Sequence, residues 1–266
     1  MQKTKKNNKF KYKLLILGLV LVLFVIDYPI LNKAISNWLV DYETGIVERV
    51  IDGDTVVVNG SSVRMLGINS PERGEKYYGE AKTFLESLTL NKLVKMRSGK
   101  EDIDLYKRKL RYIFVDNENV NKLIVQRGLA NFYFPSGKDK YYNSFFEAWG
   151  RCMSDERNLC QSSKDVCSTC ITLKNWDTKG QSVIFSNKCG MKCELTGWTI
   201  KDEGRKKFIF PNFVLNSNSE VEIKVGDGNN TNKVSYWSGE EYVWTETGDS
   251  IILRDSAGGL ILFKSY

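Results

Sequence analysis

Residues 50–68 read VIDGDTVVVNGSSVRMLGI, and this stretch decides the fold of the first half of the chain. Apolar residues lie on both sides of Asn59-Gly60, a pair that is typical of tight β-hairpin turns. Asp52-Gly53 marks another turn a few residues earlier. The pattern therefore predicts consecutive strands over Val47–Val50, Thr55–Val58 and Val63–Ile68.

The chain up to residue 160 continues with elements of both kinds. Helical spacing of apolar residues predicts helices over Tyr78–Leu90, Val120–Gly128 and Tyr141–Asp155. Further strands are predicted over Lys92–Arg97 and Leu110–Val115. Strands followed by helices indicate a small β-barrel with helices packed on it, so residues 41–160 are predicted to form an α+β domain.

Residues 171–266 read as an all-β domain. Its predicted strands are Ser182–Phe185, Gly197–Ile200, Lys207–Phe210, Glu220–Val225, Ser250–Arg254 and Leu260–Phe263. Turn residues separate them, for example at Asp202–Gly204 and Asp227–Asn230. Many short strands in a segment of this length predict a β-sandwich. Residues 161–170 carry Ser, Lys and Cys, and we interpret them as a linker or staple between the domains.

Residues 1–40 have the pattern of a membrane-targeting segment. Lysines precede an apolar run, Leu14–Ile26, which reaches the length of a bilayer span when it is counted through Leu31. An uncleaved signal anchor, a cleaved signal peptide and a buried helix of a soluble protein all stay open. We expect the anchor, because small residues that suit cleavage are scarce after Asp27. The preceding lysines favour a cytoplasmic N-terminus, so we expect a single-pass membrane protein whose C-terminal part is extracellular, or a secreted protein if cleavage occurs.

Charge and composition exclude several classes of function. The formal net charge is +7, but residues 1–40 hold seven lysines against one acid, Asp27, so most of the basic excess belongs to that segment. The overall charge is therefore no argument for a nucleic-acid partner. The chain has no histidine, which excludes Ser-His and Cys-His pairs, histidine metal ligands and an imidazole base.

The cysteines all lie in the second half of the chain, at 152, 160, 167, 170, 189 and 193. An even number of cysteines outside the cell suits disulfides, which we expect. The spacing of Cys167 with Cys170 and of Cys189 with Cys193 also approaches a four-thiolate zinc site. The pairing cannot be deduced from sequence, and both alternatives stay open.

Polar residues that could bind a ligand or take part in catalysis lie at the turns and strand ends of the first domain. Asp54 and the oxygen-rich Asn69-Ser70 offer ligands for a hard cation. Arg64 and Arg108 are suited to bidentate contacts with a phosphate, and Glu72 could position or deprotonate a water. Each residue type is also common at an ordinary turn or on a solvated strand face. The pattern alone indicates only a candidate cation and phosphate site.

Ordered blocks within residues 45–157 make this interpretation more specific. They are VIDGDT at 50–55, VRMLGINSPE at 63–72, YGEA at 78–81, DLYKR at 104–108, YIF at 112–114 and VQRGLA at 125–130. Together they resemble the staphylococcal nuclease (thermonuclease) family. The resemblance implies an OB-fold barrel with packed helices and calcium-dependent hydrolysis of phosphodiester bonds in DNA and RNA.

The resemblance assigns catalytic roles by position. Arg64, Glu72 and Arg108 match the family's catalytic residues. In the mechanism that this implies, calcium and the arginines hold the phosphate, Glu72 assists an attacking water, and the arginines favour the transition state.

The resemblance also assigns a calcium site. Asp54 matches the first calcium carboxylate, and Asp52 is an acid beside the metal. Asn69 falls where the family has a second calcium aspartate, and Ser70 falls where a threonine contributes its backbone carbonyl. Because Asn69 is neutral, the site lacks one charge, and we expect weaker calcium binding.

The nucleotide-binding residues match the family less completely. Tyr106 matches a contact to a nucleotide phosphate, whereas Leu105 replaces a lysine that contacts phosphate. Phe134 replaces a tyrosine of the nucleotide site, although Tyr133 is adjacent. These departures leave Tyr106 and Tyr133 as the predicted nucleotide-binding residues.

Blocks in the second domain carry a resemblance of their own. They are LTGWTI at 195–200, FIFP at 208–211, FVL at 213–215 and TGDSIIL at 247–253. They resemble a lamin-tail domain, which implies an immunoglobulin-like sandwich over residues 171–266 that binds or tethers an unidentified ligand.

Taken together, these patterns predict an extracellular, membrane-anchored endonuclease of the thermonuclease type that acts on single-stranded DNA and RNA. The alternatives are a catalytically inactive surface module that binds nucleic acid or protein, and a structural surface protein. The joint presence of Arg64, Glu72 and Arg108 argues for the enzyme.

Overall fold

The computed structural model describes residue 13, residue 18 and residues 42–266. Residues 43–266 form one compact unit, which contains both of the predicted globular domains. The predicted signal anchor falls on residues that lie, but for those two positions, outside the described part. Among the described residues, no helix is both long and apolar enough to span a membrane.

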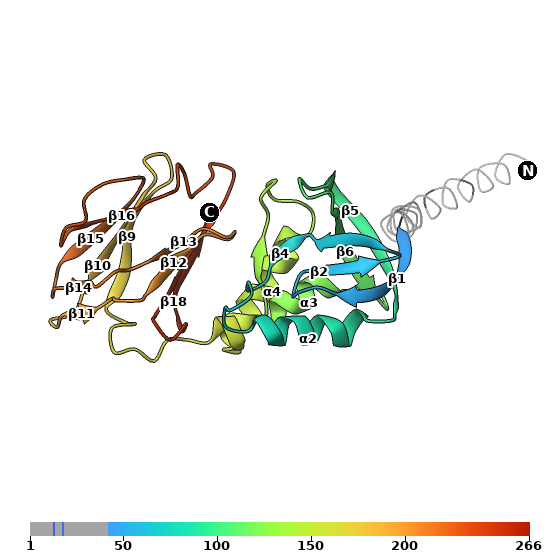
Figure 1. Cartoon of the computed structure of the whole chain (residues 1–266), viewed down its shortest axis with the longest axis horizontal. Coiled ribbons are helices and arrows are strands. Elements are labelled where there is room, and N and C mark those ends of the chain that lie inside the picture. The colour runs from blue at the N-terminus through green and yellow to red at the C-terminus, as the bar shows by residue number, and fades with distance from the viewer. Residues whose placement is uncertain (1–12, 14–17, 19–41) are drawn as a thin grey trace, which may run out of the picture. The chain divides into compact units, whose positions relative to one another are not determined.

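The first domain is a closed, OB-fold-like barrel of five strands (Figure 1). The strands are β1 (Glu43–Val50), β2 (Thr55–Val58), β3 (Ser61–Met65), β5 (Leu93–Ile103) and β6 (Lys109–Val115), with the short β7 (Glu118–Asn119) beyond β6. Their order is β3-β2-β1-β5-β6, and a parallel pairing of β3 with β6 closes the barrel. The predicted hairpin is confirmed, since β2 and β3 pair across Asn59-Gly60 with Thr55 opposite Arg64.

The predicted strand Val63–Ile68 is interrupted near its end, and this interruption directs the following residues away from the barrel. The chain leaves β3 and forms β4 (Gly67–Asn69), which pairs with β8 (Asn131–Tyr133), a strand that the sequence pattern did not reveal. Gly67 has a φ of +74°, a conformation that residues with a Cβ disfavour. A Cβ at Gly67 would also lie only 3.0 Å from the ring of Phe145. A glycine is therefore required where the chain turns off the barrel.

Three helices pack on the barrel: α2 (Tyr78–Thr89), α3 (Val120–Gln126) and α4 (Tyr142–Ser154) (Figure 1). All three were predicted, with ends within two residues of the observed ones. Leu85, Ile124 and Trp149 are fully buried side chains from these helices, and they share one hydrophobic core with the barrel strands. Burial of large apolar side chains of this kind is the main stabilising contribution to such a domain.

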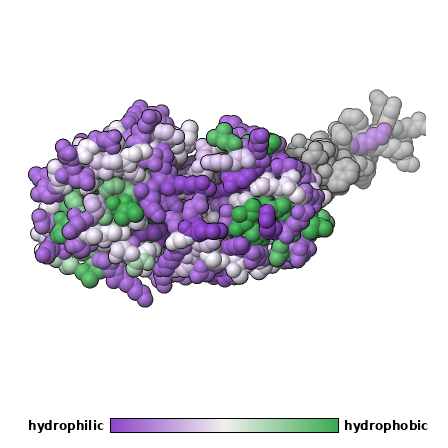
Figure 2. All heavy atoms as spheres, viewed as in Figure 1, coloured by the Kyte–Doolittle hydropathy of each residue, from purple (hydrophilic) through white to green (hydrophobic). Residues whose placement is uncertain are grey.

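The second domain is a β-sandwich of two four-stranded sheets. One sheet has the order β16-β15-β10-β9 and contains β16 (Val234–Trp237), β15 (Glu220–Val225), β10 (Ser182–Asn187) and β9 (Ile171–Asp177). The other has the order β13-β12-β17-β18 and contains β13 (Lys207–Ile209), β12 (Thr199–Lys201), β17 (Ser250–Arg254) and β18 (Leu260–Ser265). Trp198, Phe185 and Ile251 are buried in the core of the sandwich. Figure 2 shows hydrophilic residues over most of the face in view, with separate apolar patches on both domains.

The sandwich also contains elements that the sequence did not predict. Strands β9 and β16 were missed, as was a small two-stranded sheet of β11 (Cys193–Glu194) and β14 (Val214–Leu215). The pairing of β15 with β16 is parallel, so these neighbouring strands are not joined by a simple hairpin.

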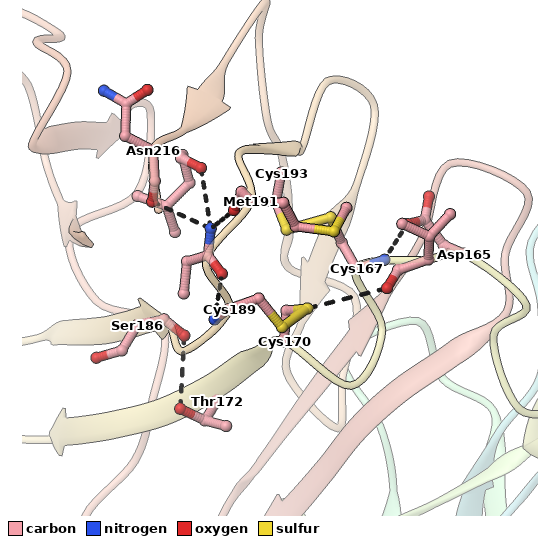
Figure 3. The surroundings of a disulfide bond; sticks show 12 residues. Asp165, Cys167, Cys170, Thr172, Ser186, Cys189, Met191, Cys193 and Asn216 are labelled. Atoms are coloured by element: carbon pink, nitrogen blue, oxygen red, sulfur yellow. Dashed lines mark hydrogen bonds between the residues drawn. A yellow bond between two sulfur atoms is a disulfide. The ribbon is translucent and has the colours of Figure 1, made fainter. Parts of the chain in front are cut away.

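Three disulfides join the six cysteines in the pairs Cys152–Cys160, Cys167–Cys193 and Cys170–Cys189, which leaves no free cysteine. The first ties α4 to the short 3-10 helix η1 (Asn158–Cys160). The other two lie close together and tie the segment 161–170 to the sandwich (Figure 3). Of the two alternatives for the cysteines, disulfides are therefore confirmed. The segment is stapled to the second domain, and Ser163 also donates its backbone N–H to the Leu260 carbonyl, 2.8 Å away.

Candidate active site

Asp54 lies at the centre of the polar cluster that the sequence predicted. The tight turn before β2 places it there, with the backbone N–H of Asp54 donating to Asp52 Oδ1 at 3.0 Å. The buried Asp54 carboxylate then accepts hydrogen bonds from both the backbone N–H and the hydroxyl of Ser70, at 2.8 and 3.0 Å. A Cβ at Gly53 would lie 2.7 Å from the Cβ of Ser70, so glycine permits this close approach.

Arg64 is held rigidly beside Asp54. It lies on β3, it is only 7% exposed, and its Nη2 is 3.1 Å from Asp54 Oδ2. The same Nη2 donates to Asn69 Oδ1 at 3.3 Å, and Nη1 donates to the Met65 carbonyl at 2.6 Å. A buried guanidinium needs such partners, because an unpaired buried charge is strongly destabilising. The structure thus brings together four of the predicted residues: Asp54, Arg64, Asn69 and Ser70.

Arg108 is positioned differently, in the turn that precedes β6. Its Nε forms an ion pair with Asp104 Oδ2 at 2.7 Å, and its guanidinium lies 5.3 Å from the centroid of the Tyr106 ring. Burial tends to raise the pKa of Asp104, but hydrogen bonds and the positive charge from Arg108 outweigh it and lower that pKa. Asp104 therefore stays ionised and fixes Arg108 as a charged donor.

Glu72 is the most exposed of the predicted catalytic residues. It lies in the segment between β4 and α2, and its side chain is 52% exposed. Its carboxylate forms an ion pair with the Nε of Arg205, at 3.1 Å. Arg205 belongs to the sandwich domain, so the second domain contacts a predicted catalytic residue.

A cavity of about 480 Å³ connects several of these residues. Its lining includes Arg64, Asn69 and Arg108, together with both predicted nucleotide-binding residues, Tyr106 and Tyr133. Asp52, Asp54, Ser70 and Glu72 are predicted site residues that do not line it. The cavity is of the size that suits a small ligand or part of a polymer. The tyrosine and arginine side chains provide the aromatic and cationic groups that bind a nucleotide strand.

The sandwich supplies part of the lining of this cavity. The sequence did not predict that contribution. Asp202, Gly204, Arg205 and Lys206 line it from the loop between β12 and β13. That stretch was interpreted simply as a turn. Its dense charge, in the sequence DEGRK at 202–206, was the signal that could have drawn attention to it.

Two buried acids of this loop have unusual protonation behaviour. Burial, followed by the negative charge of Asp249, raises the pKa of Asp202 to about 7. Burial likewise raises the pKa of Glu203 to about 8, although a hydrogen bond from the backbone N–H of Phe134 opposes the rise. Both acids therefore change charge near neutral pH.

The oxygen ligands fit a hard cation in their chemistry. Burial raises the pKa of Asp52, and the neighbouring negative charge of Asp54 raises it further, a repulsion that a bound cation would relieve. Asn69 and Ser70 add neutral oxygens next to Asp54. In the described part of the chain, however, no group of three or more acidic, histidine or cysteine side chains is placed to hold a metal. The donors therefore fit an oxygen-bound cation in chemical type, with Asp54 as the charged ligand and Asp52 beside it.

Comparisons with known proteins identify the class of each domain. Residues 62–161 match the family model of staphylococcal nuclease homologues, and residues 162–266 match that of the Lamin Tail Domain. The thermonuclease of Staphylococcus intermedius is 30% identical over 139 residues, which cover 48% of this chain and 83% of the relative. The thermonuclease of Staphylococcus hyicus is 28% identical over 141 residues, which cover 49% and 82%.

A third relative has a similar level of identity. The micrococcal nuclease of Shigella flexneri is 32% identical over 107 residues, which cover 35% of this chain and 60% of the relative. The chain therefore belongs to the staphylococcal nuclease family, with a lamin-tail domain that follows the nuclease domain.

Proposed function

We propose that this chain is a calcium-dependent endonuclease that hydrolyses phosphodiester bonds of single-stranded DNA and RNA. The observation that carries the proposal is the shared cavity, in which Arg64, Arg108, Tyr106 and Tyr133 come together. Two guanidinium groups facing one cavity suit a phosphodiester, and the tyrosines suit the adjoining nucleotides.

In the proposed mechanism, Arg64 and Arg108 bind the scissile phosphate and stabilise the charge that develops in the transition state. Asp54 holds Arg64 in place, and Asp104 does the same for Arg108, so neither guanidinium has to reorganise during the reaction. Glu72 receives a proton from the attacking water, for which its exposed carboxylate is suitable.

Calcium would be held by the carboxylate of Asp54, with Asn69 and the backbone carbonyl of Ser70 as neutral ligands and Asp52 as an acid beside the metal. When bound, the ion supplies positive charge that polarises the phosphate. The neutral amide at Asn69 leaves fewer charged ligands than a site with a second aspartate would have, which supports a weak calcium site.

We also propose that the enzyme works outside the cell, anchored in the membrane through its N-terminal segment. The lysines before the apolar run support this orientation, and three disulfides suit an oxidising environment. The lamin-tail domain would then be extracellular as well, where its own ligand is still to be identified.

A digestion assay tests the enzymatic proposal. The full chain should cut a single-stranded DNA with calcium and stop when a chelator is added. Glu72→Gln should lose about 10²-fold or more in rate, the scale of removing one essential group from such a site. Glu147→Gln, at an exposed position of α4, makes the same change of charge and should cut like the wild type. Binding without cutting by the wild type would favour the inactive surface module instead.

A further inference from the structure

The loop between β12 and β13 brings two cationic side chains of the sandwich to the cavity, Arg205 and Lys206. Lys206 forms an ion pair with Glu240, 3.2 Å away. Arg205 lines the cavity together with Arg64 and Arg108, yet it comes from the sandwich. Its side chain is 56% exposed, and its Nε is paired with Glu72. Within residues 42–266, the structure gives its two Nη groups no hydrogen-bond partner. Arg205 thus has donors available for an anion that enters the cavity.

The backbone that carries Arg205 is fixed against the barrel. Asn69 donates from its side-chain amide to the Gly204 carbonyl at 2.7 Å, and Asn131 donates in the same way to the Glu203 carbonyl at 2.6 Å. The Glu203 carboxylate accepts the backbone N–H of Phe134 at 3.0 Å. These contacts come from residues on or next to β4 and β8, the strands that the kink at Gly67 brings together. Contacts with the barrel therefore fix the position of this loop.

The barrel residues at positions 64 and 105 offer few free donors to a substrate phosphate. Arg64 is nearly fully buried, and its two Nη groups already interact with Asp54, Asn69 and Met65, so only its remaining N–H donors can contact a phosphate. At Leu105, where a resemblance to the family would place a phosphate-contacting lysine, an apolar side chain is 99% exposed. The barrel thus has no cation at position 105, although Lys100 and Lys138 also line the cavity, and the sandwich presents Arg205 to the same space.

We propose that Arg205 is a substrate-binding residue, whose guanidinium contacts a backbone phosphate of the single strand in the cavity. This inference rests on the proposed nuclease function and adds the lamin-tail domain to the active site. In the free protein Arg205 pairs with Glu72. When substrate enters, a phosphate replaces that carboxylate as the partner of Arg205, which leaves Glu72 to interact with water. Arginine suits this role because its planar fork can bind two phosphate oxygens at once.

The test measures binding separately from cleavage. A fluorescent single-stranded oligonucleotide is titrated with the full chain in chelator, and anisotropy gives Kd at several salt concentrations. Arg205→Ala should raise Kd about five- to tenfold, and the slope of log Kd against log salt should fall by about 0.7, the value for one phosphate contact to a single strand. In calcium, KM should rise by a similar factor while kcat changes less than about threefold.

Two further variants show that the effect belongs to the guanidinium in the cavity. Arg205→Lys keeps the charge and should recover part of the affinity while losing the bidentate contact. Lys233→Ala removes one positive charge from an exposed position of the sandwich that does not line the cavity, and should leave Kd and salt slope unchanged.

The outcomes separate this proposal from the nuclease function. Wild-type binding and cleavage by Arg205→Ala would overturn the role of Arg205 and leave the nuclease standing. Faster cleavage by Arg205→Ala at unchanged Kd would also overturn it, since Arg205 would then only block Glu72. A salt slope that depends on Arg205 in a chain that never cleaves would uphold the phosphate contact and overturn the hydrolysis.

Discussion

Arg64 and Arg205 face one cavity from two domains, and they are held in opposite ways. Arg64 is 7% exposed, and hydrogen bonds or an ion pair from residues close to it in sequence fix its guanidinium. Arg205 is half exposed, and an ion pair joins it to Glu72, far away in the sequence. The first arginine belongs to the rigid barrel, and the second reaches the site only because two domains are packed together.

This difference separates two kinds of function within one cavity. A rigid, desolvated guanidinium is suited to stabilise a transition state, because it needs no reorganisation when charge develops. A half-exposed arginine is suited to capture substrate, because it can exchange one anionic partner for another at low cost. We therefore expect substitutions at Arg64 to act mainly on kcat, and substitutions at Arg205 mainly on KM.

The largest effect is expected at Arg64. Arg64→Ala should lower kcat by about 10²-fold or more, the scale of removing one transition-state donor. It also leaves the buried Asp54 carboxylate without its cation, and breaking a buried ion pair in this way costs about 3–5 kcal/mol of folding free energy. Steady-state kinetics and urea unfolding of the same preparations measure the two losses.

Arg108→Ala provides the comparison within the barrel. It should lose a similar factor in kcat, but Arg108 is partly exposed, so its removal should lower the free energy of unfolding by less than about 1 kcal/mol. If Arg108→Ala cut like the wild type, the two-arginine site would be wrong. If Arg64→Ala had the same free energy of unfolding as the wild type, the buried ion pair between Arg64 and Asp54 would not stabilise the fold.

The sequence predicted the residues around Arg64 because local structure fixes them. Asp54 belongs to the turn before β2, Arg64 lies opposite Thr55 on the hairpin, and Ser70 follows the next strand. Short-range turn signals and strand alternation are enough to place such residues near one another. The barrel and its three helices were predictable for the same reason.

The contribution of the sandwich could not be predicted in this way. Gly204 and Asn69 are hydrogen-bonded across 135 positions of sequence, a contact that no periodic pattern encodes. The kink at Gly67 was also hidden, because VRMLGI reads as one continuous strand. The sequence analysis explained Asn69 only as a weakened calcium ligand. The structure adds another use for its amide, since an aspartate at this position could not donate a hydrogen bond to Gly204.

Asn69→Asp should therefore have two effects of intermediate size. The added carboxylate should lower the calcium concentration for half-maximal cutting by about three- to tenfold, because calcium affinity rises with ligand charge. The lost donor to Gly204 should loosen the loop that carries Arg205 and raise KM by a few-fold. Calcium titration at saturating DNA, followed by DNA titration at saturating calcium, separates the two. A calcium midpoint that does not move would remove residue 69 from the ligand set.

The smallest effect on cutting is expected from pH, which acts on the stability of the loop that carries Arg205. The pKa of Asp202 is about 7 and that of Glu203 about 8, both raised by burial above the ordinary values of 3.8 and 4.5. The neighbouring Asp249 raises both, whereas Lys201 and Lys206 lower the first and Lys138 lowers the second. Tyr133 and Tyr266 face the same acids, and their own pKa values are raised as well.

The sign of the effect follows from these raised values. In the folded protein Asp202 and Glu203 keep their protons to a higher pH than in the unfolded chain, which releases them above about pH 4. The stabilisation that these bound protons provide is therefore complete below about pH 4 and is lost as pH rises through 7 to 8. Between pH 6 and pH 9 the free energy of unfolding should fall, by at most about 1.4 kcal/mol per pH unit for each acid. Glu203→Gln keeps an acceptor for the Phe134 N–H but cannot titrate, so its urea unfolding should depend less on pH than that of the wild type. An equal slope in both proteins would show that Glu203 is already ionised at pH 6, and the loop would then present Arg205 independently of pH.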